Sequence, residues 1–373
     1  MRKIPDMTVP RRGRTRGLSL VELLVASAIG IIASLAIFQV FAVFEGQKRT
    51  STSGGEAQTS GTLALYTIER DVRQGGYGFN TPDTVGCTLQ GWDQLAGAAI
   101  APTTLVAAFI AQGAGSTPGV AGAPDTITVA YGNADALPAG ALAIGVSSLG
   151  TTDDFIKTVN AMYGFQPGDV VVIAEAGKPC TLAQVNQTPP ATGDNARLNL
   201  QAGTYVDPVT TATLNTRYNN PAGLGTAYTT AGKVYNFGSN PTFKVFSVQN
   251  AQLVSQAFGA AAATPLFDNI VQLQAQYGKD LNNDGTVDVF DETTPADSTQ
   301  WAAVLALRIG VVARSSLYEK DEVSPPTIRL WDDSATPPTT TGPVWTLTSD
   351  ERHYRYKVFQ TVVPLRNMIW RPY

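Results

Sequence analysis

The sequence has few of the side chains on which enzymes most often rely. Among its 373 residues there is one histidine, His353, which excludes metal sites built from several histidines. There is no Gly-x-Ser-x-Gly motif, no cluster of catalytic metal ligands and no phosphate-binding loop. A lone histidine beside Tyr354 is more often a packing residue than a catalytic one. We therefore predict that the protein is not an enzyme, and a membrane-tethered enzyme is the weaker alternative.

Charge and cysteine are also scarce. Charged residues make up only 15% of the chain, whereas Gly, Ala, Thr and Pro are abundant. This composition favours an extracellular, β-rich domain over a cytosolic enzyme. The two cysteines, Cys87 and Cys180, are predicted to form a disulfide, because an even number in an exported protein indicates pairing. Two buried thiols are the alternative.

One long apolar segment lies near the N-terminus. Residues 18–44 contain a single charged side chain, Glu22, and about 20 apolar residues can cross a bilayer as a helix. An ordinary secretory signal is disfavoured, because the run is longer than a typical signal core and no Ala-x-Ala site follows it. A basic cluster before such a segment stays in the cytoplasm, so the C-terminal bulk should lie outside. The basic residues are Arg2, Lys3, Arg11, Arg12, Arg14 and Arg16.

Glu22 is the unusual residue of this segment. A carboxylate one turn into a membrane helix is costly, and such a residue usually marks a function. If the chain were cut after Gly17, Leu18 would carry a new amino group four residues before Glu22. Within one chain the ammonium and carboxylate would form a weak pair, whereas between chains they would set the axial register of packed helices. The alternative is a tolerated interfacial charge that snorkels outward.

The stretch from Arg16 to Glu22 resembles the class III signal of type IV prepilins, which has a basic leader, a glycine, an apolar residue and a glutamate at the fifth mature position. The resemblance implies that a prepilin peptidase cleaves between Gly17 and Leu18 and methylates the new amine of Leu18. It also implies that Glu22 acts in assembly. The family usually has Phe where this chain has Leu18. Residues 1–17 are then a leader peptide.

Residues 18–75 are predicted to form a long helix with two parts. The part over residues 18–44 is the transmembrane segment, and the part over residues 56–75 is amphipathic. A bend or a short melt is expected at the glycines between them. Three apolar residues at helical spacing form the face that should lie on a sheet. They are Leu65, Ile68 and Val72.

Residues 76–373 are predicted to form a β-rich globular domain in the periplasm or outside the cell. The fold class is α+β, with the long N-terminal helix packed on an antiparallel β-sheet. β-branched runs bounded by Gly, Pro, Asn and Asp predict the main strands. They are residues 125–131, 169–173, 233–237, 243–248, 301–314 and 354–363. Residues 111–124 and 202–230 are predicted to be long surface loops.

Residues 280–291 have the spacing D-x-N-x-D-G-x-x-D-x-x-D of an EF-hand-like loop. Calcium takes six to eight oxygen ligands, and this pattern supplies them from a short segment. The predicted ligands are Asp280, Asn282, Asp284, Thr286 through its carbonyl, Asp288 and Asp291. Alternation over residues 270–277 indicates that the loop leaves a strand. The alternative is an Asx-rich hairpin turn without an ion.

Other stretches resemble PilW-type minor pilins. They are residues 68–77, residues 165–173, the Tyr-Gly-x-Asp run that begins at Tyr277, and residues 363–367. The resemblance implies a minor pilin that helps to assemble or prime a type IV pilus, with adhesion, twitching motility and DNA uptake as open further roles. A minor pseudopilin of a type II secretion system is the alternative.

The resemblance also implies partners and a location. The partners are other minor and major pilins, the prepilin peptidase and the pilus assembly machinery of the bacterial inner membrane. The protein would span that membrane once, with its globular domain in the periplasm, and would later enter the extracellular pilus. Without the leader, 20 basic residues face 29 acidic ones, which argues against nucleic-acid binding. Apart from calcium, no cofactor is implied.

Overall fold

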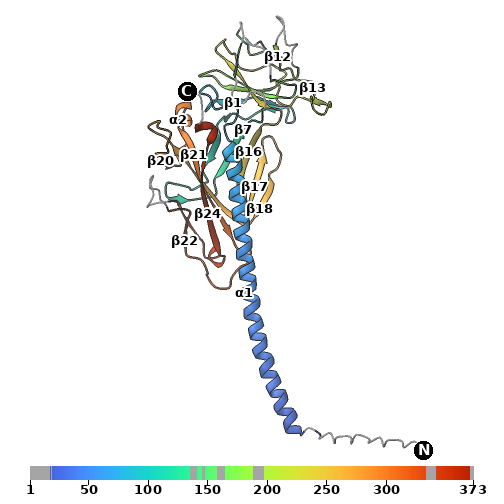
Figure 1. Cartoon of the computed structure of the whole chain (residues 1–373), viewed down its shortest axis with the longest axis vertical. Helices are drawn as coiled ribbons and strands as arrows, with labels where there is room; N and C mark the ends of the chain where they lie inside the picture. The colour runs from blue at the N-terminus through green and yellow to red at the C-terminus, as the bar shows by residue number, and fades with distance from the viewer. Residues whose placement is uncertain are drawn as a thin grey trace, which may run out of the picture. The chain divides into compact units, whose positions relative to one another are not determined.

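The computed structural model describes residues 17, 19–134, 141–144, 148–157, 164–187, 197–332 and 342–369. The chain divides into two compact units, Met1–Thr52 and Ser53–Tyr373, and each is described by itself. Helix α1 begins in the first unit and ends in the second, where the strands of the described residues lie (Figure 1). The predicted α+β class, a long N-terminal helix followed by a domain rich in antiparallel sheets, is confirmed.

Helix α1 spans Leu20–Gln74 without interruption. The bend or melt that the sequence predicts does not break the helix, because Gly46, Gly54 and Gly55 are all helical. Each glycine costs roughly 1 kcal/mol relative to alanine, and a long cooperative helix absorbs costs of this size. Gly76 lies just past the end with a φ of +82°, a conformation that suits glycine and stops the helix.

Two antiparallel sheets form the core around the second half of α1, and Figure 1 shows this half running beside β16, β17 and β24. One sheet has the order β18 (Thr264–Asp268), β17 (Gln252–Ala257), β16 (Thr242–Gln249), β7 (Thr126–Tyr131) and β5 (Ala108–Ala111). The other has the order β20 (Val289–Asp291), β19 (Ile270–Lys279), β21 (Val304–Arg314) and β24 (Tyr356–Pro364). The predicted stripe of Leu65, Ile68 and Val72 is buried in this core, which confirms its role.

A buried ion pair fixes the helix to the first of these sheets. Asp71 on α1 is 1% exposed, and its carboxylate lies 2.7 Å from the ammonium of Lys244 on β16. Arg70 approaches the same carboxylate at 3.3 Å from the solvent side. A buried carboxylate needs a cation or several hydrogen-bond donors to offset its lost hydration. Because Asp71 finds its cation on β16, the pair specifies which part of the helix meets that strand.

The last strand packs on the middle of α1. Gly61 lies directly against the ring of Phe359 on β24, and a Cβ at this glycine would overlap the ring. Close by, the ammonium of Lys357 donates to the Oε1 of Gln58 at 2.7 Å. Glycine is therefore required here for close approach and not for its backbone freedom.

The C-terminal segment also closes the end of α1. The short helix α3 (Arg366–Ile369) follows β24, and the side-chain amide of Asn367 donates to the carbonyls of Gln74 and Gly75 at 3.0 and 3.1 Å. These carbonyls have no partner within the helix, because the last turn of any helix leaves its acceptors unsatisfied. Asn367 therefore serves as a C-cap for α1, although it lies near the other end of the sequence.

Strand β19 presents different side chains to its two faces. From Leu273 onward, every second residue enters the core shared with α1. On the other face Gln272 and Gln274 are buried, and each donates at 3.0 Å to a backbone carbonyl in residues 122–123. The segment 111–124 is therefore not a simple surface loop as predicted. Two buried amides hold it on the sheet, and it contains the short strand β6 (Val120–Ala121).

Most of the remaining strands build a second body of sheet around its own cores. Its main sheet has the order β4 (Thr103–Thr104), β1 (Thr88–Gln90), β11 (Cys180–Gln184), β10 (Val170–Ala174), β15 (Lys233–Gly238) and β8 (Ala141–Ala143). Smaller pairs are β2 (Trp92–Asp93) with β3 (Ala98–Ala99), β12 (Arg197–Asn199) with β9 (Phe155–Lys157), and β13 (Thr204–Val206) with β14 (Thr213–Asn215). The triplet of β22 (Thr327–Arg329), β23 (Val344–Thr346) and β6 does not belong to this body, because its core residues pack on β21, β19 and β24.

Most predicted strands lie within two residues of their observed bounds. One strand and one predicted loop need correction. Trp301 begins the predicted strand 301–314 but belongs to helix α2 (Ser298–Ala302), which Asp297 caps by accepting from the N–H of Gln300. The segment 202–230 carries the β13–β14 hairpin and buried residues such as Asn219, so it is only in part a surface loop. A short 3-10 turn (Glu351–His353) precedes β24.

Candidate functional site

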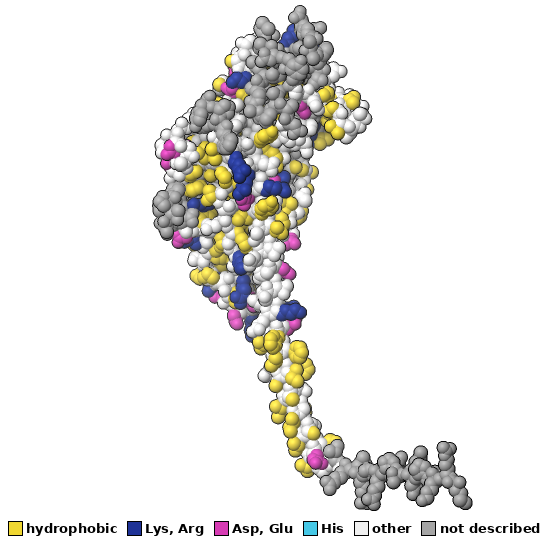
Figure 2. Space-filling model, in the orientation of Figure 1, with side chains coloured by type: hydrophobic (Ala, Val, Ile, Leu, Met, Phe, Trp, Pro, Cys, Tyr) yellow, Lys and Arg dark blue, Asp and Glu magenta, His cyan; other side chains and the backbone are white. Residues whose placement is uncertain are grey.

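The first half of α1 is an apolar helix with no protein packed on it in the described part of the chain. Its large apolar side chains from Leu20 to Phe44 are between 52% and 77% exposed, and Figure 2 shows them along this half of the helix. Leaving this much apolar surface in water is unfavourable, at about 25 cal/mol per Å². By length and composition the helix can cross a membrane. It therefore requires apolar surroundings, supplied by a bilayer or by other helices.

Glu22 takes part in a reciprocal hydrogen-bonded cap at the start of α1. Its carboxylate accepts from the backbone N–H of Ser19 at 2.9 Å, and the hydroxyl of Ser19 accepts from the backbone N–H of Glu22 at 3.2 Å. This is a capping box, and it satisfies two N–H groups that a helix otherwise leaves unpaired. The Ser-x-x-Glu spacing was readable from the sequence. Glu22 thus has a local role besides any pairing with a neighbouring chain.

Two serines in the apolar half are satisfied within the helix. The hydroxyl of Ser27 donates to the carbonyl of Leu24 at 2.9 Å, and that of Ser34 donates to the carbonyl of Gly30 at 2.8 Å. Hydroxyls paired in this way can enter an apolar environment without an unmet hydrogen bond. A Cβ at Gly30 would meet no atom within 4 Å, so this position is open to a neighbouring helix.

The predicted cleavage site lies at the edge of the described residues. Gly17 is described and exposed, whereas the rest of the leader and Leu18 lie outside the described residues. Cleavage between Gly17 and Leu18 and methylation of Leu18 remain predictions.

The predicted calcium loop connects β19 to β20 as an Asx-rich turn. The carboxylate of Asp280 accepts from three successive backbone N–H groups, those of residues 283–285, at 2.6, 3.2 and 2.8 Å. Hydrogen bonds from the hydroxyl and N–H of Thr286 lower the pKa of Asp284. Gly285 has a φ of +86°, which the sharp turn requires. The loop therefore has the compact form that both a calcium site and an ion-free turn would share.

The six predicted calcium ligands do not all converge. Asp288 accepts from the N–H of Leu281 at 2.7 Å and lies beside Asn282, whereas Asp291 sits on β20 with its carboxylate 2.6 Å from the ammonium of Lys279. Among the described residues, no group of three or more His, Cys, Asp or Glu side chains is arranged to hold a metal ion. The five predicted ligands within residues 280–288 therefore fit a calcium loop better than Asp291, which is paired with Lys279. Calcium binding stays a prediction.

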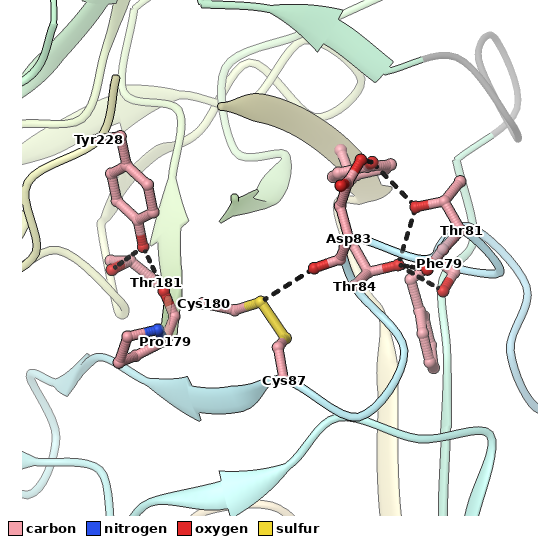
Figure 3. The surroundings of a disulfide bond; sticks show 10 residues. Phe79, Thr81, Asp83, Thr84, Cys87, Pro179, Cys180, Thr181 and Tyr228 are labelled. Atoms are coloured by element: carbon pink, nitrogen blue, oxygen red, sulfur yellow. Dashed lines mark hydrogen bonds between the residues drawn. A yellow bond between two sulfur atoms is a disulfide. The ribbon is translucent and has the colours of Figure 1, made fainter. Parts of the chain in front are cut away.

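The disulfide between Cys87 and Cys180 is confirmed. It ties the chain just before β1 to the first residue of β11, and Figure 3 shows it between these two strands. The neighbouring polar groups are internally paired. Thr84 donates to the carbonyl of Phe79 at 2.6 Å, and Tyr228 donates to the carbonyl of Pro179 at 2.9 Å. A bond closing 93 residues contributes about 4 to 5 kcal/mol in the chain-entropy model.

These features define a class of α+β protein with one long N-terminal helix. By length and composition the first half of this helix can cross a membrane, and the second half lies in the core of a domain of antiparallel sheets. Residues 228–367 match the model of a family described as Type IV Pilus-assembly protein W. The match runs from β15 to α3 and covers less than half of the chain. It points to a role in type IV pilus assembly. No curated protein and no solved structure matches the chain.

Proposed function

We propose that this protein is a minor pilin, a subunit that helps to prime or assemble a type IV pilus. The observation that carries the proposal is the family match over residues 228–367. The exposed apolar half of α1 supports it, because a subunit that leaves the membrane for a filament must exchange lipid for neighbouring helices. The protein would work by assembly with other pilins and the inner-membrane machinery, and not as an enzyme.

The proposed route begins in the inner membrane, with the globular domain in the periplasm. A prepilin peptidase would cut between Gly17 and Leu18 and methylate the new amine of Leu18. Glu22 would then pair with the amine of a neighbouring subunit. The capping box with Ser19 supports this order of events, because it satisfies the carboxylate of Glu22 inside one chain until a stronger partner is present.

The test is to follow Glu22→Ala from the membrane to the pilus. The variant should insert into the inner membrane as the wild type does and should be strongly depleted from sheared pili. Glu45→Ala is the matched control, because it removes a carboxylate from the same helix just past the apolar run. Equal amounts of the wild type and Glu22→Ala in sheared pili would contradict the pairing role. Recovery of the wild type with a type II secretion complex, and never with pili, would identify a pseudopilin instead.

We also propose that residues 280–289 bind calcium through Asp280, Asn282, Asp284, Thr286 and Asp288. The compact loop supports this proposal, since Asp280 already gathers the backbone around itself and Gly285 makes the sharp turn. A bound ion would tie the β19–β20 hairpin together without any change in the core.

A further inference from the structure

Each of the two sheets that pack on α1 ends in a strand whose outer side is open. One sheet ends in β24, which has nine residues, and the other ends in β18, which has five. Within the described residues, no backbone group of these two strands bonds to anything outside its own sheet. An open edge of this kind is a row of unpaired N–H and C=O groups that another strand can join.

The outward-pointing groups of β24 can be identified from its pairing with β21. The N–H of Leu365 donates to the carbonyl of Leu305 at 2.8 Å, and the N–H of Ser315 donates to the carbonyl of Arg355 at 2.7 Å. These two bonds continue the β21–β24 ladder past both of its ends, and the register between them is unbroken. Because the bonds of an antiparallel ladder involve every second residue, the even-numbered residues of β24 point their N–H and C=O groups outward.

The side chains that flank the two open edges differ in charge. Residues 355–366 contain Arg355, Lys357 and Arg366 and no acidic residue. Residues 245–278 contain no basic residue, and Asp268 on β18 is their single charged side chain. Lys357 and Asp268 are both exposed. Opposite charges on neighbouring strands stabilise their pairing, whereas like charges oppose it.

The two edge strands run in opposite directions along α1. β24 is parallel to the helix, because its start lies beside Gln58 and the segment after it caps Gln74. β16 begins beside the end of the helix, where Lys244 meets Asp71, and it runs back along α1 (Figure 1). Since β17 is antiparallel to β16 and β18 is antiparallel to β17, β18 runs against α1 as β16 does. In two copies that stand side by side with parallel α1 helices, β24 of one and β18 of the other are therefore antiparallel.

This direction also brings the opposite charges together. Lys357 is the second residue of β24, and Asp268 is the last residue of β18. In an antiparallel pair the start of one strand lies opposite the end of the other. Asp268 of one copy would thus lie near Lys357 of the next, and residues 264–267 would extend along residues 358–362. There they would cover Val362, which is 45% exposed.

We propose that β24 of one copy pairs with β18 of a second copy, so that neighbouring subunits share one continuous sheet. The inference rests on the proposed assembly role, which brings copies side by side. The pairing is head-to-tail, so each copy keeps one open edge and the contact can repeat along an assembly. β18 has only five residues, so the contact is small. It should form where α1 concentrates the copies in a membrane or a filament, and not between copies in dilute solution.

The test is disulfide cross-linking in membranes of cells that make the full chain. The background is low, because Cys87 and Cys180 are the only cysteines and are bonded to each other. Differently tagged Lys357→Cys and Asp268→Cys chains, made in the same cell, should give a covalent dimer with both tags on mild oxidation. A chain that carries both substitutions should give a ladder of multimers. If neither the dimer nor the ladder forms, the proposal fails.

Thr264→Cys is the matched control for Asp268→Cys. It is exposed and lies at the other end of β18, about 13 Å away at the rise of a strand. Cysteines whose Cα atoms are more than about 7 Å apart cannot be bridged, so Thr264→Cys with Lys357→Cys should give at most about a fifth of the dimer. Equal yields from the two pairs would overturn the pairing. An equal yield from Lys357→Cys alone would indicate two β24 strands that pair with each other, and would overturn it as well.

A photo-cross-linking side chain at residue 360 tests the contact without new cysteines, in case those variants do not accumulate. Gln360 is exposed and belongs to the outward-pointing residues of β24. Irradiation should join it to residues 264–268 of a second copy, as mass spectrometry of the digested product would show. Products with another protein alone would overturn the choice of a second copy.

The same experiments separate this contact from the proposed pilus role. Cross-links in the membranes of cells whose sheared pili never contain the protein would support the contact and contradict the pilus role. A chain that enters pili and gives no cross-link in membranes or in pili would contradict the contact alone.

Discussion

At the scale of single residues, Asp125 is the clearest case of a buried charge used for structure. Its side chain is fully buried, and its carboxylate accepts from the N–H groups of Gly113 at 2.8 Å and Ala275 at 2.9 Å. One carboxylate thus joins the segment 111–124 to β19. Burial raises the pKa of Asp125 to about 6, although both hydrogen bonds oppose the shift.

This shift predicts a dependence of stability on pH. The folded state holds the proton of Asp125 more tightly than the unfolded state, whose pKa is about 4. The free energy of unfolding should therefore be highest below pH 4 as far as this group is concerned, and should fall as pH rises to about 6. Asp125→Asn should flatten the change in melting temperature between pH 4.5 and 6.5. Asp169, whose pKa burial also raises, should maintain a residual slope. An unchanged slope in Asp125→Asn would refute the assignment.

The calcium loop gives a second prediction at this scale. Calcium should raise the melting temperature of the full chain, and EDTA should reverse the rise. Asp284→Ala should abolish the effect, because it removes a central ligand. Asp207→Ala is the control, since Asp207 is also an exposed residue that accepts backbone N–H groups in a turn. If the wild type melts at one temperature with calcium and with EDTA, the loop is only a turn.

At the scale of elements, the contact between α1 and β24 reverses a common rule. Replacing an exposed helical glycine by alanine stabilises a helix by roughly 1 kcal/mol. Gly55→Ala should follow this rule, because a Cβ there meets no atom within 4 Å. Gly61→Ala should destabilise the second unit by a few kcal/mol, since its Cβ would overlap the ring of Phe359. Thermal unfolding of both variants measures whether each substitution raises or lowers the stability. A Gly61→Ala variant that is more stable than the wild type would contradict the close packing.

Elements were predictable from the sequence where their pattern is local. The apolar stripe of α1 and the strands around residues 126–131 and 304–314 follow from periodicity, and they are confirmed. The disulfide followed from two cysteines in a chain that is predicted to be exported, and it is confirmed. Trp301 was placed in a strand because it is continuous with an apolar run, and the cap at Asp297 that makes it helical was overlooked.

What the sequence could not show depends on contacts between distant segments. The buried amides of β19 find their carbonyls some 150 residues earlier in the chain, and the cap of α1 comes from Asn367, 293 residues after Gln74. A run rich in Gly and Ala looks like a loop until the sheet that covers it is known. A cavity beside β1 and β11 was missed for the same reason, because its lining residues come from six separate stretches of the chain.

At the scale of the whole molecule, the proposed removal of the leader is the step to test. Gly17→Ala should block removal of the leader, because the resemblance to prepilins makes this glycine the residue before the cut. The variant should run more slowly on a gel than the wild type and should keep Met1 or its neighbour at its N-terminus. Gly46→Ala is the control, as it changes a glycine of α1 far from the cut. A normal mature N-terminus in Gly17→Ala would refute the signal.

The cap that Asn367 places on Gln74 and Gly75 also has a consequence for biosynthesis. The end of α1 is the first part of the second unit to leave the ribosome. Its packing is complete only when the segment around Asn367, which is among the last to be made, is present. Early synthesis therefore yields an unfinished helix, and the domain can complete its packing only after nearly the whole polypeptide has been made. A chain that stops short of β24 would remain open, and proteases could remove it before it reached any partner.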